Sequence, residues 1–110
     1  MKMLTAEIIK KLEKSPLYST EKINVKPIIV KFFNPTGSGS WYVCEGEKQE
    51  DGDWLFFGFV DLLEKEWGYF TLSELQSVKG RFGLGIERDM YFDGMVANVN
   101  TNEISKAVSA

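Results

Sequence analysis

Apolar side chains are densest in residues 53–75, which hold seven of the fifteen aromatic residues in the chain. Residues 54–60 form a nearly continuous run of aromatic and β-branched side chains between acidic turn residues, which is typical of a buried strand. Gly58 interrupts this run, and that indicates a bulge or the close approach of another backbone. Residues 61–66 are charged and predict a turn, and residues 67–70 predict a second strand that pairs with the first.

Two helices are predicted, one from a capping motif and one from hydrophobic periodicity. Thr71 and Glu74 have the spacing of a capping box, in which both side chains satisfy N–H groups of the first helical turn. This motif predicts a short helix over residues 72–78, ended by Gly80. Near the N-terminus, apolar residues recur at helical spacing within residues 4–14 and predict an amphipathic helix that packs on a sheet.

Shorter apolar runs predict the other strands. In one of them, alternation places Trp41, Val43 and Glu45 on the same face. The expected segments are strands at 28–33, 41–47, 90–92 and 95–99, a loop at 34–40, and a weak helix or tail at 101–110. Together these segments predict a single α+β domain over residues 1–110. Its mainly antiparallel sheet would have four to six strands, with residues 93–110 adding a hairpin strand and tail.

The residue types present exclude several kinds of chemistry. The chain has no histidine, which removes histidine-dependent nucleophilic catalysis and the commonest zinc ligand. Its one cysteine, Cys44, cannot form an internal disulfide and fits a buried position in a reducing cytoplasm. Because neither a signal peptide nor a membrane-spanning stretch is visible, we expect a cytoplasmic protein. We predict no cofactor and no metal site.

The net charge of −3 conceals an uneven distribution, with a net charge of +4 in residues 1–44 and −7 in residues 45–74. These acids could simply be the solvated turns and faces of a small sheet. Alternatively, they form an acidic surface that binds a host protein whose basic surface normally holds nucleic acid. Direct nucleic-acid binding by this chain is not expected. The candidate partner-binding residues are Glu45, Glu47, Glu50, Asp51, Asp53, Glu64 and Glu66.

A second candidate site is a polar cluster of Tyr69, Glu87, Arg88 and Asp89. Its two carboxylates flank the guanidinium in sequence, and a structural ion-pair network explains this arrangement most simply. If these residues also lie near Glu64, the cluster could serve a carboxylate-based enzyme or a small-molecule binder. We keep that activity as the alternative function.

Several motifs occur in a specific order between residues 4 and 92. They are Pro16-Leu-Tyr18, Val30-Lys-Phe-Phe33, Trp41-Tyr42, Asp51-Gly-Asp-Trp-Leu-Phe-Phe-Gly58, Gly68-Tyr-Phe-Thr-Leu-Ser-Glu-Leu75 and Gly85-Ile-Glu-Arg-Asp89. Together they resemble the DUF2958 family. The resemblance implies a small accessory protein of bacteria, phages or other mobile elements, some of whose relatives neighbour antirestriction genes. It implies no catalytic residue and no cofactor.

These observations favour a small non-enzymatic protein that binds another protein on behalf of a phage or mobile element. Inhibition of a host defence nuclease, as by an anti-CRISPR or antirestriction protein, would use the acidic surface described above. The surplus of aromatic residues and an exposed sheet edge also leave a homodimer open.

Overall fold

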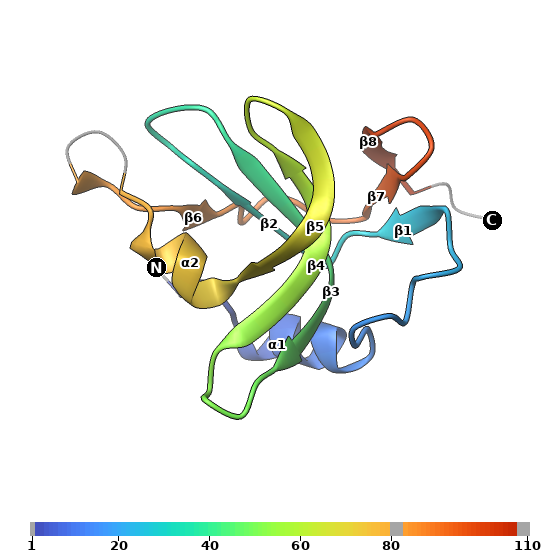
Figure 1. The fold of residues 1–110 in the computed structure, drawn as a ribbon, viewed down its shortest axis with the longest axis horizontal. Coiled ribbons are helices and arrows are strands. Elements are labelled where there is room, and N and C mark those ends of the chain that lie inside the picture. Colours follow the sequence, from blue (N-terminus) through green and yellow to red (C-terminus); the bar gives the residue numbers. More distant parts are fainter. Residues whose placement is uncertain (1, 80–82, 108–110) are drawn as a thin grey trace.

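Two helices and two antiparallel sheets make up the computed structural model, which describes residues 2–79 and 83–107 (Figure 1). This arrangement confirms the predicted α+β domain. The elements are α1 (Ala6–Glu13), β1 (Val25–Pro27), β2 (Val30–Phe33), β3 (Ser40–Lys48), β4 (Trp54–Asp61), β5 (Lys65–Thr71), α2 (Leu72–Ser77), β6 (Glu87–Arg88), β7 (Met95–Asn98) and β8 (Glu103–Lys106).

The main sheet has five strands in the order β5-β4-β3-β2-β6. The predicted hairpin of the aromatic segment is confirmed, because Phe56 of β4 lies opposite Phe70 of β5. The loop between β2 and β3 is also where the sequence predicts it. Since β5 pairs with β4 alone within the described chain, it is an edge strand.

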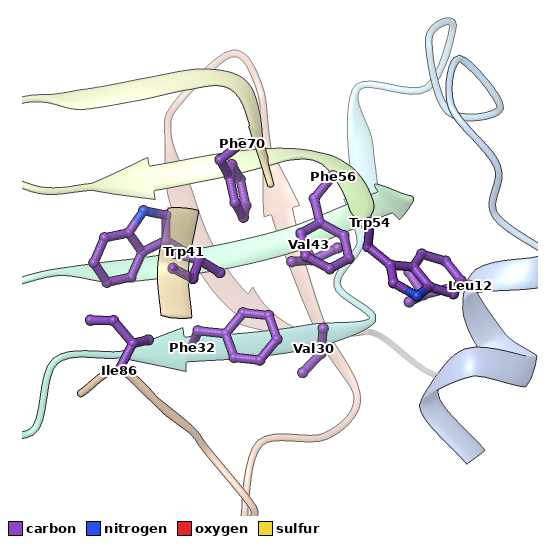
Figure 2. Packing of buried hydrophobic residues seen from close by; sticks show 10 residues of the cluster. Leu12, Val30, Phe32, Trp41, Val43, Trp54, Phe56, Phe70 and Ile86 are labelled. Atoms are coloured by element: carbon purple, nitrogen blue, oxygen red, sulfur yellow. The ribbon is translucent and has the colours of Figure 1, made fainter. Parts of the chain in front are cut away.

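Aromatic and branched side chains fill the core on one face of the main sheet, here called the core face (Figure 2). Phe32, Val43 and Phe56 meet at the centre of this cluster. Leu12 of α1 lies at one end beside Trp54, and burial of this apolar stripe explains why α1 packs where it does. The prediction of an N-terminal helix on the sheet is confirmed, with the Thr5 hydroxyl accepting from the N–H of Ile8 at its start.

A β-bulge in β3 changes which face its later side chains occupy. Val43 lies opposite Gly58, but Glu45 lies opposite Phe57, so Cys44 is the extra residue. A side chain at Gly58 would place its Cβ 1.9 Å from the Tyr42 carbonyl oxygen, which confirms the predicted close backbone approach. After the bulge, Glu45 lies on the face opposite the core face, here called the second face. The prediction that Glu45 shares a face with Val43 is therefore wrong.

A small sheet with the strand order β1-β7-β8 packs against part of the second face. The predicted strand at 28–33 is confirmed over residues 30–33 as β2, but it is too long at its start, because the chain changes sheets at residues 28 and 29. Ile28 donates its N–H to Met95 next to the small sheet, whereas Ile29 donates to Val43 in the main sheet. Residues 90–92 form a turn rather than a strand. Within the expected helix or tail at 101–110, residues 103–106 form β8, and residues 108–110 lie outside the described chain.

The Thr71 half of the predicted capping box is confirmed, whereas Glu74 bonds the Thr71 hydroxyl instead of a backbone N–H. The Thr71 hydroxyl accepts from the N–H of Glu74 at 3.1 Å and donates to the Glu74 carboxylate at 3.1 Å. Helix α2 ends one residue before Val78, so it is slightly shorter than predicted. Gly80, the expected helix stop, lies outside the described residues.

Candidate functional site

Glu45 is the most unusual polar residue of the second face, because its side chain is only 2% exposed. One carboxylate oxygen accepts from the N–H of Tyr18 at 2.7 Å. The other accepts from the N–H of Thr20 at 2.8 Å and from the Thr20 hydroxyl. A buried carboxylate is stable only when such donors replace water. Glu45 therefore fixes the loop between α1 and β1 against the main sheet.

Lys26 is the second buried charge at this place, with 4% of its surface exposed. It is the middle residue of β1, whose alternation turns its side chain inward while both neighbours face outward. Its ammonium group donates to the carbonyl of Thr20. Thr20 thus bridges the two charges: its backbone N–H and hydroxyl bind the carboxylate, and its carbonyl binds the ammonium.

A cavity of about 310 Å³ lies between the α1–β1 loop, β1 and the second face. It is here called the tyrosine pocket. Its polar and aromatic lining comes from Tyr18, Glu21, Asn24, Lys26, Glu45, Phe57 and Tyr69. Ile23 and Val99 add apolar surface at its edge. This volume is at the lower end of the range for ligand pockets in proteins.

The two tyrosines of the pocket are accessible to a partner, because Tyr18 is 64% exposed and Tyr69 is 51% exposed. Tyr18 has a φ of +72°, a left-handed backbone conformation that a bulky residue adopts only when its surroundings enforce it. The hydrogen bond from its N–H to Glu45 supplies that constraint. Such outliers concentrate at functional sites, which singles out Tyr18 as a candidate binding residue.

The pKa of Tyr69 lies above its ordinary value. Partial desolvation, a hydrogen bond with Tyr18 and the negative charges of Glu45 and Glu21 all raise it. Tyr69 is therefore a neutral phenol at physiological pH, able to donate a hydrogen bond or to present its ring.

The predicted acidic surface is not continuous in the structure. Because Glu45 is buried, its assignment to an exposed partner-binding surface is wrong. The exposed acid Glu47 lies near the end of β3, and Glu50 and Asp51 lie in the turn between β3 and β4. In contrast, Glu64 and Glu66 lie at the opposite end of β4, where the chain turns into β5 (Figure 1).

The carboxylate of Asp53 is hydrogen-bonded to other residues of the protein. It accepts from the Ser73 hydroxyl at 2.5 Å and from the Ser73 N–H at 3.1 Å. The hydroxyl contact is the main cause that lowers the pKa of Asp53. These bonds tie the start of β4 to α2, which is a structural role.

The predicted polar cluster is also divided. Tyr69 lies on β5 at one edge of the main sheet, and Glu87 and Arg88 form β6 at the other edge. Asp89 follows β6 and lies 3.6 Å from Lys31, and the Arg88 guanidinium donates to the carbonyl of Lys2. Grouping Glu87, Arg88 and Asp89 with Tyr69 and Glu64 in one site is therefore wrong.

Within the described chain, no group of three or more cysteine, aspartate or glutamate side chains is arranged to hold a metal ion. In that same part of the chain, no helix is long and apolar enough to cross a membrane.

Comparison with known proteins gives a family but no function. The model of a family described as "Protein of unknown function (DUF2958)" matches residues 3–107. The chain belongs to the DUF2958 family. Comparison of this DUF2958 protein with curated proteins and with solved structures finds no match.

Sequence reasoning missed the site residues Tyr18, Glu21 and Lys26 of this DUF2958 protein. They lie in a segment without periodicity, and nothing local signals that Lys26 turns inward. One signal was present for Tyr18, since it belongs to the Pro16-Leu-Tyr18 motif by which the family was identified.

Proposed function

We propose that this DUF2958 protein is a small accessory protein of a phage or mobile element that acts by binding a host protein, and that it is not an enzyme. The tyrosine pocket is the observation that carries this proposal. Its mouth exposes Tyr18, Tyr69 and Ile23 together, whereas isolated apolar residues on a protein surface need no explanation.

The chemistry of the mouth suits a protein partner. Tyrosine is enriched at protein interfaces because it combines a large apolar ring with a polar tip and loses little conformational entropy. Buried bonds to Glu45 hold the backbone of Tyr18 and Thr20 in place before binding. A surface organised in advance loses less entropy when it binds, and this favours recognition.

The groups in the pocket are poorly suited to acid–base catalysis. Both oxygens of Glu45 already accept hydrogen bonds from the loop, and Lys26 already donates to Thr20. The raised pKa of Tyr69 makes it a weaker acid at neutral pH, whereas an activated phenol would need a lowered value. These properties favour binding over chemistry.

The partner in this proposal carries a basic surface. Glu47 lies two positions beyond Glu45 on the second face, and Glu50 and Asp51 follow in the adjoining turn. These exposed acids would steer a basic partner toward the pocket without being the main contact. A nucleic-acid-binding defence nuclease has such a surface, so anti-CRISPR or antirestriction activity is the form that we propose.

The test compares two exposed tyrosines. Tagged wild-type protein, Tyr69→Ala and Tyr91→Ala are expressed in a bacterial host with defined CRISPR and restriction systems, and captured proteins are identified by mass spectrometry. Tyr91 is 92% exposed and lies outside the pocket, so its variant is the matched control. We expect a stoichiometric partner with the wild type and with Tyr91→Ala, and its loss with Tyr69→Ala.

Two other results would change the proposal. If both tyrosine variants capture as much partner as the wild type does, the pocket is not the binding site. If reversing the charges of Glu50 and Asp51 together leaves capture and nuclease inhibition unchanged, the steering role of the acidic turn is wrong.

A further inference from the structure

The tyrosine pocket combines aromatic rings with negative charge. Tyr18, Tyr69 and Phe57 supply three rings around one cavity, and the Phe57 and Tyr69 ring centroids are 5.0 Å apart. Aromatic faces attract cations through their quadrupole, most strongly where water is partly excluded. Sites that bind ammonium groups in proteins commonly use such rings.

The charges that line the pocket favour a cation over an anion. Glu21 and Glu45 are negative, and Lys26 is the cation among the lining residues. The Lys26 ammonium is already bound to Thr20 beside Glu45, so these two buried charges largely compensate each other. The carboxylate of Glu21 remains exposed at the mouth. Its negative charge is among the smaller causes that raise the pKa of Tyr69, after desolvation and the hydrogen bond with Tyr18.

From this arrangement we infer that the tyrosine pocket binds the side chain of a lysine or arginine on the partner protein. The apolar stem would lie against the rings of Tyr18 and Tyr69, and the charged end would reach Glu21. This inference rests on the proposed function, because it names the chemical group that the partner inserts. A phosphate or carboxylate would be repelled by the same charges.

The test uses simple probes that carry one side chain each. Protein labelled with ¹⁵N is titrated with N-α-acetyl-lysine amide and N-α-acetyl-arginine amide, and amide chemical shifts are followed. N-α-acetyl-norleucine amide is the matched probe, because it keeps the aliphatic stem and lacks the ammonium group. We expect saturable shifts at residues 18–24 and 69 with the cationic probes, and none with the norleucine probe.

A charge-removing variant identifies the carboxylate. Glu21→Gln should weaken binding of the lysine probe about fivefold, the upper range for an exposed ion pair. Glu64→Gln removes another exposed acid, which lies outside the pocket, and should leave binding unchanged. Since Glu21 is exposed, both variants should keep the fold.

Several outcomes would overturn the inference. Equal shifts with the norleucine probe would show an apolar pocket without cation selectivity, and no shifts would show that the pocket does not take this group. Much tighter binding of spermidine would identify a free polyamine, rather than a protein side chain, as the ligand. If capture still depends on Tyr69 while the probes fail, the proposed function stands and only the nature of the inserted group is wrong.

Discussion

Replacing Glu45 by glutamine tests the buried network on which the pocket depends. The carboxylate receives three hydrogen bonds, from the N–H groups of Tyr18 and Thr20 and from the Thr20 hydroxyl. Glutamine has nearly the same shape but only one accepting oxygen. Its amide group must therefore face at least one N–H donor that now has no acceptor.

The expected loss follows from these bonds. Two bonds that survive change from charged to neutral acceptors, which costs about 1 kcal/mol each. One buried N–H without an acceptor costs about 1–3 kcal/mol more. Glu45→Gln should therefore lower the free energy of unfolding by about 3–5 kcal/mol. That is a large part of the total stability of a typical domain, about 5–15 kcal/mol.

Urea unfolding followed by tryptophan fluorescence measures this loss. With a slope of roughly 2 kcal/mol per molar urea, the midpoint should fall by about 1.5–2.5 M. Glu47→Gln is the control, because Glu47 lies on the same strand and face but is exposed, and its one bond from Leu17 survives the change. If the two variants unfold within about 1 kcal/mol of each other, Glu45 does not organise the loop.

Four further predictions concern the fold. Gly58→Ala should abolish folding as judged by circular dichroism, because its Cβ would lie 1.9 Å from the Tyr42 carbonyl oxygen. Gly68→Ala is the control and should fold normally, because its Cβ would meet nothing within 4 Å. Equal melting temperatures for the two variants would contradict the close approach at Gly58. Burial raises the pKa of the Cys44 thiol from 9.0 to about 12. At pH 8 this thiol should therefore react with a disulfide reagent only as the protein unfolds. Rapid reaction of the thiol in the folded protein would refute its burial. Because the unfolded thiol ionises first, the stability that this group contributes is fully present below pH 9 and should be lost as pH rises from 9 to about 12. The loss of stability over this range should be smaller in Cys44→Ala, where only other groups such as Tyr69 contribute. Thr71→Ala should lower the free energy of unfolding by about 1 kcal/mol, because the helix cap is lost. Thr71→Ser keeps the hydroxyl and should lower it much less. Equal melting temperatures for the two variants would show that the cap contributes nothing.

Features that depend on neighbouring residues could be predicted from the sequence. The aromatic hairpin, the capping box at Thr71 and the amphipathic stripe of α1 all follow from short-range spacing. Gly58 also signalled its role, since a glycine within an aromatic strand indicates close backbone packing.

The position of the site could not be predicted, because it depends on long-range pairing. A single extra residue at Cys44 moves Glu45 to the other face, and alternation alone gives no sign of that shift. Likewise, the pairing of β6 with β2 carries Glu87 and Arg88 to the edge farthest from Tyr69. Acids that are close in the sequence are separated for the same reason, since β4 holds its two turns apart.

Hydrogen–deuterium exchange of the protein with and without its captured partner would locate the binding surface. Exchange should be slower in the partner complex at residues 17–24 and 65–71, which border the tyrosine pocket. Exchange in the turn at 49–53 should change less. Protection confined to that turn, or to residues around Tyr91, would contradict the claim that this protein binds its partner through the tyrosine pocket.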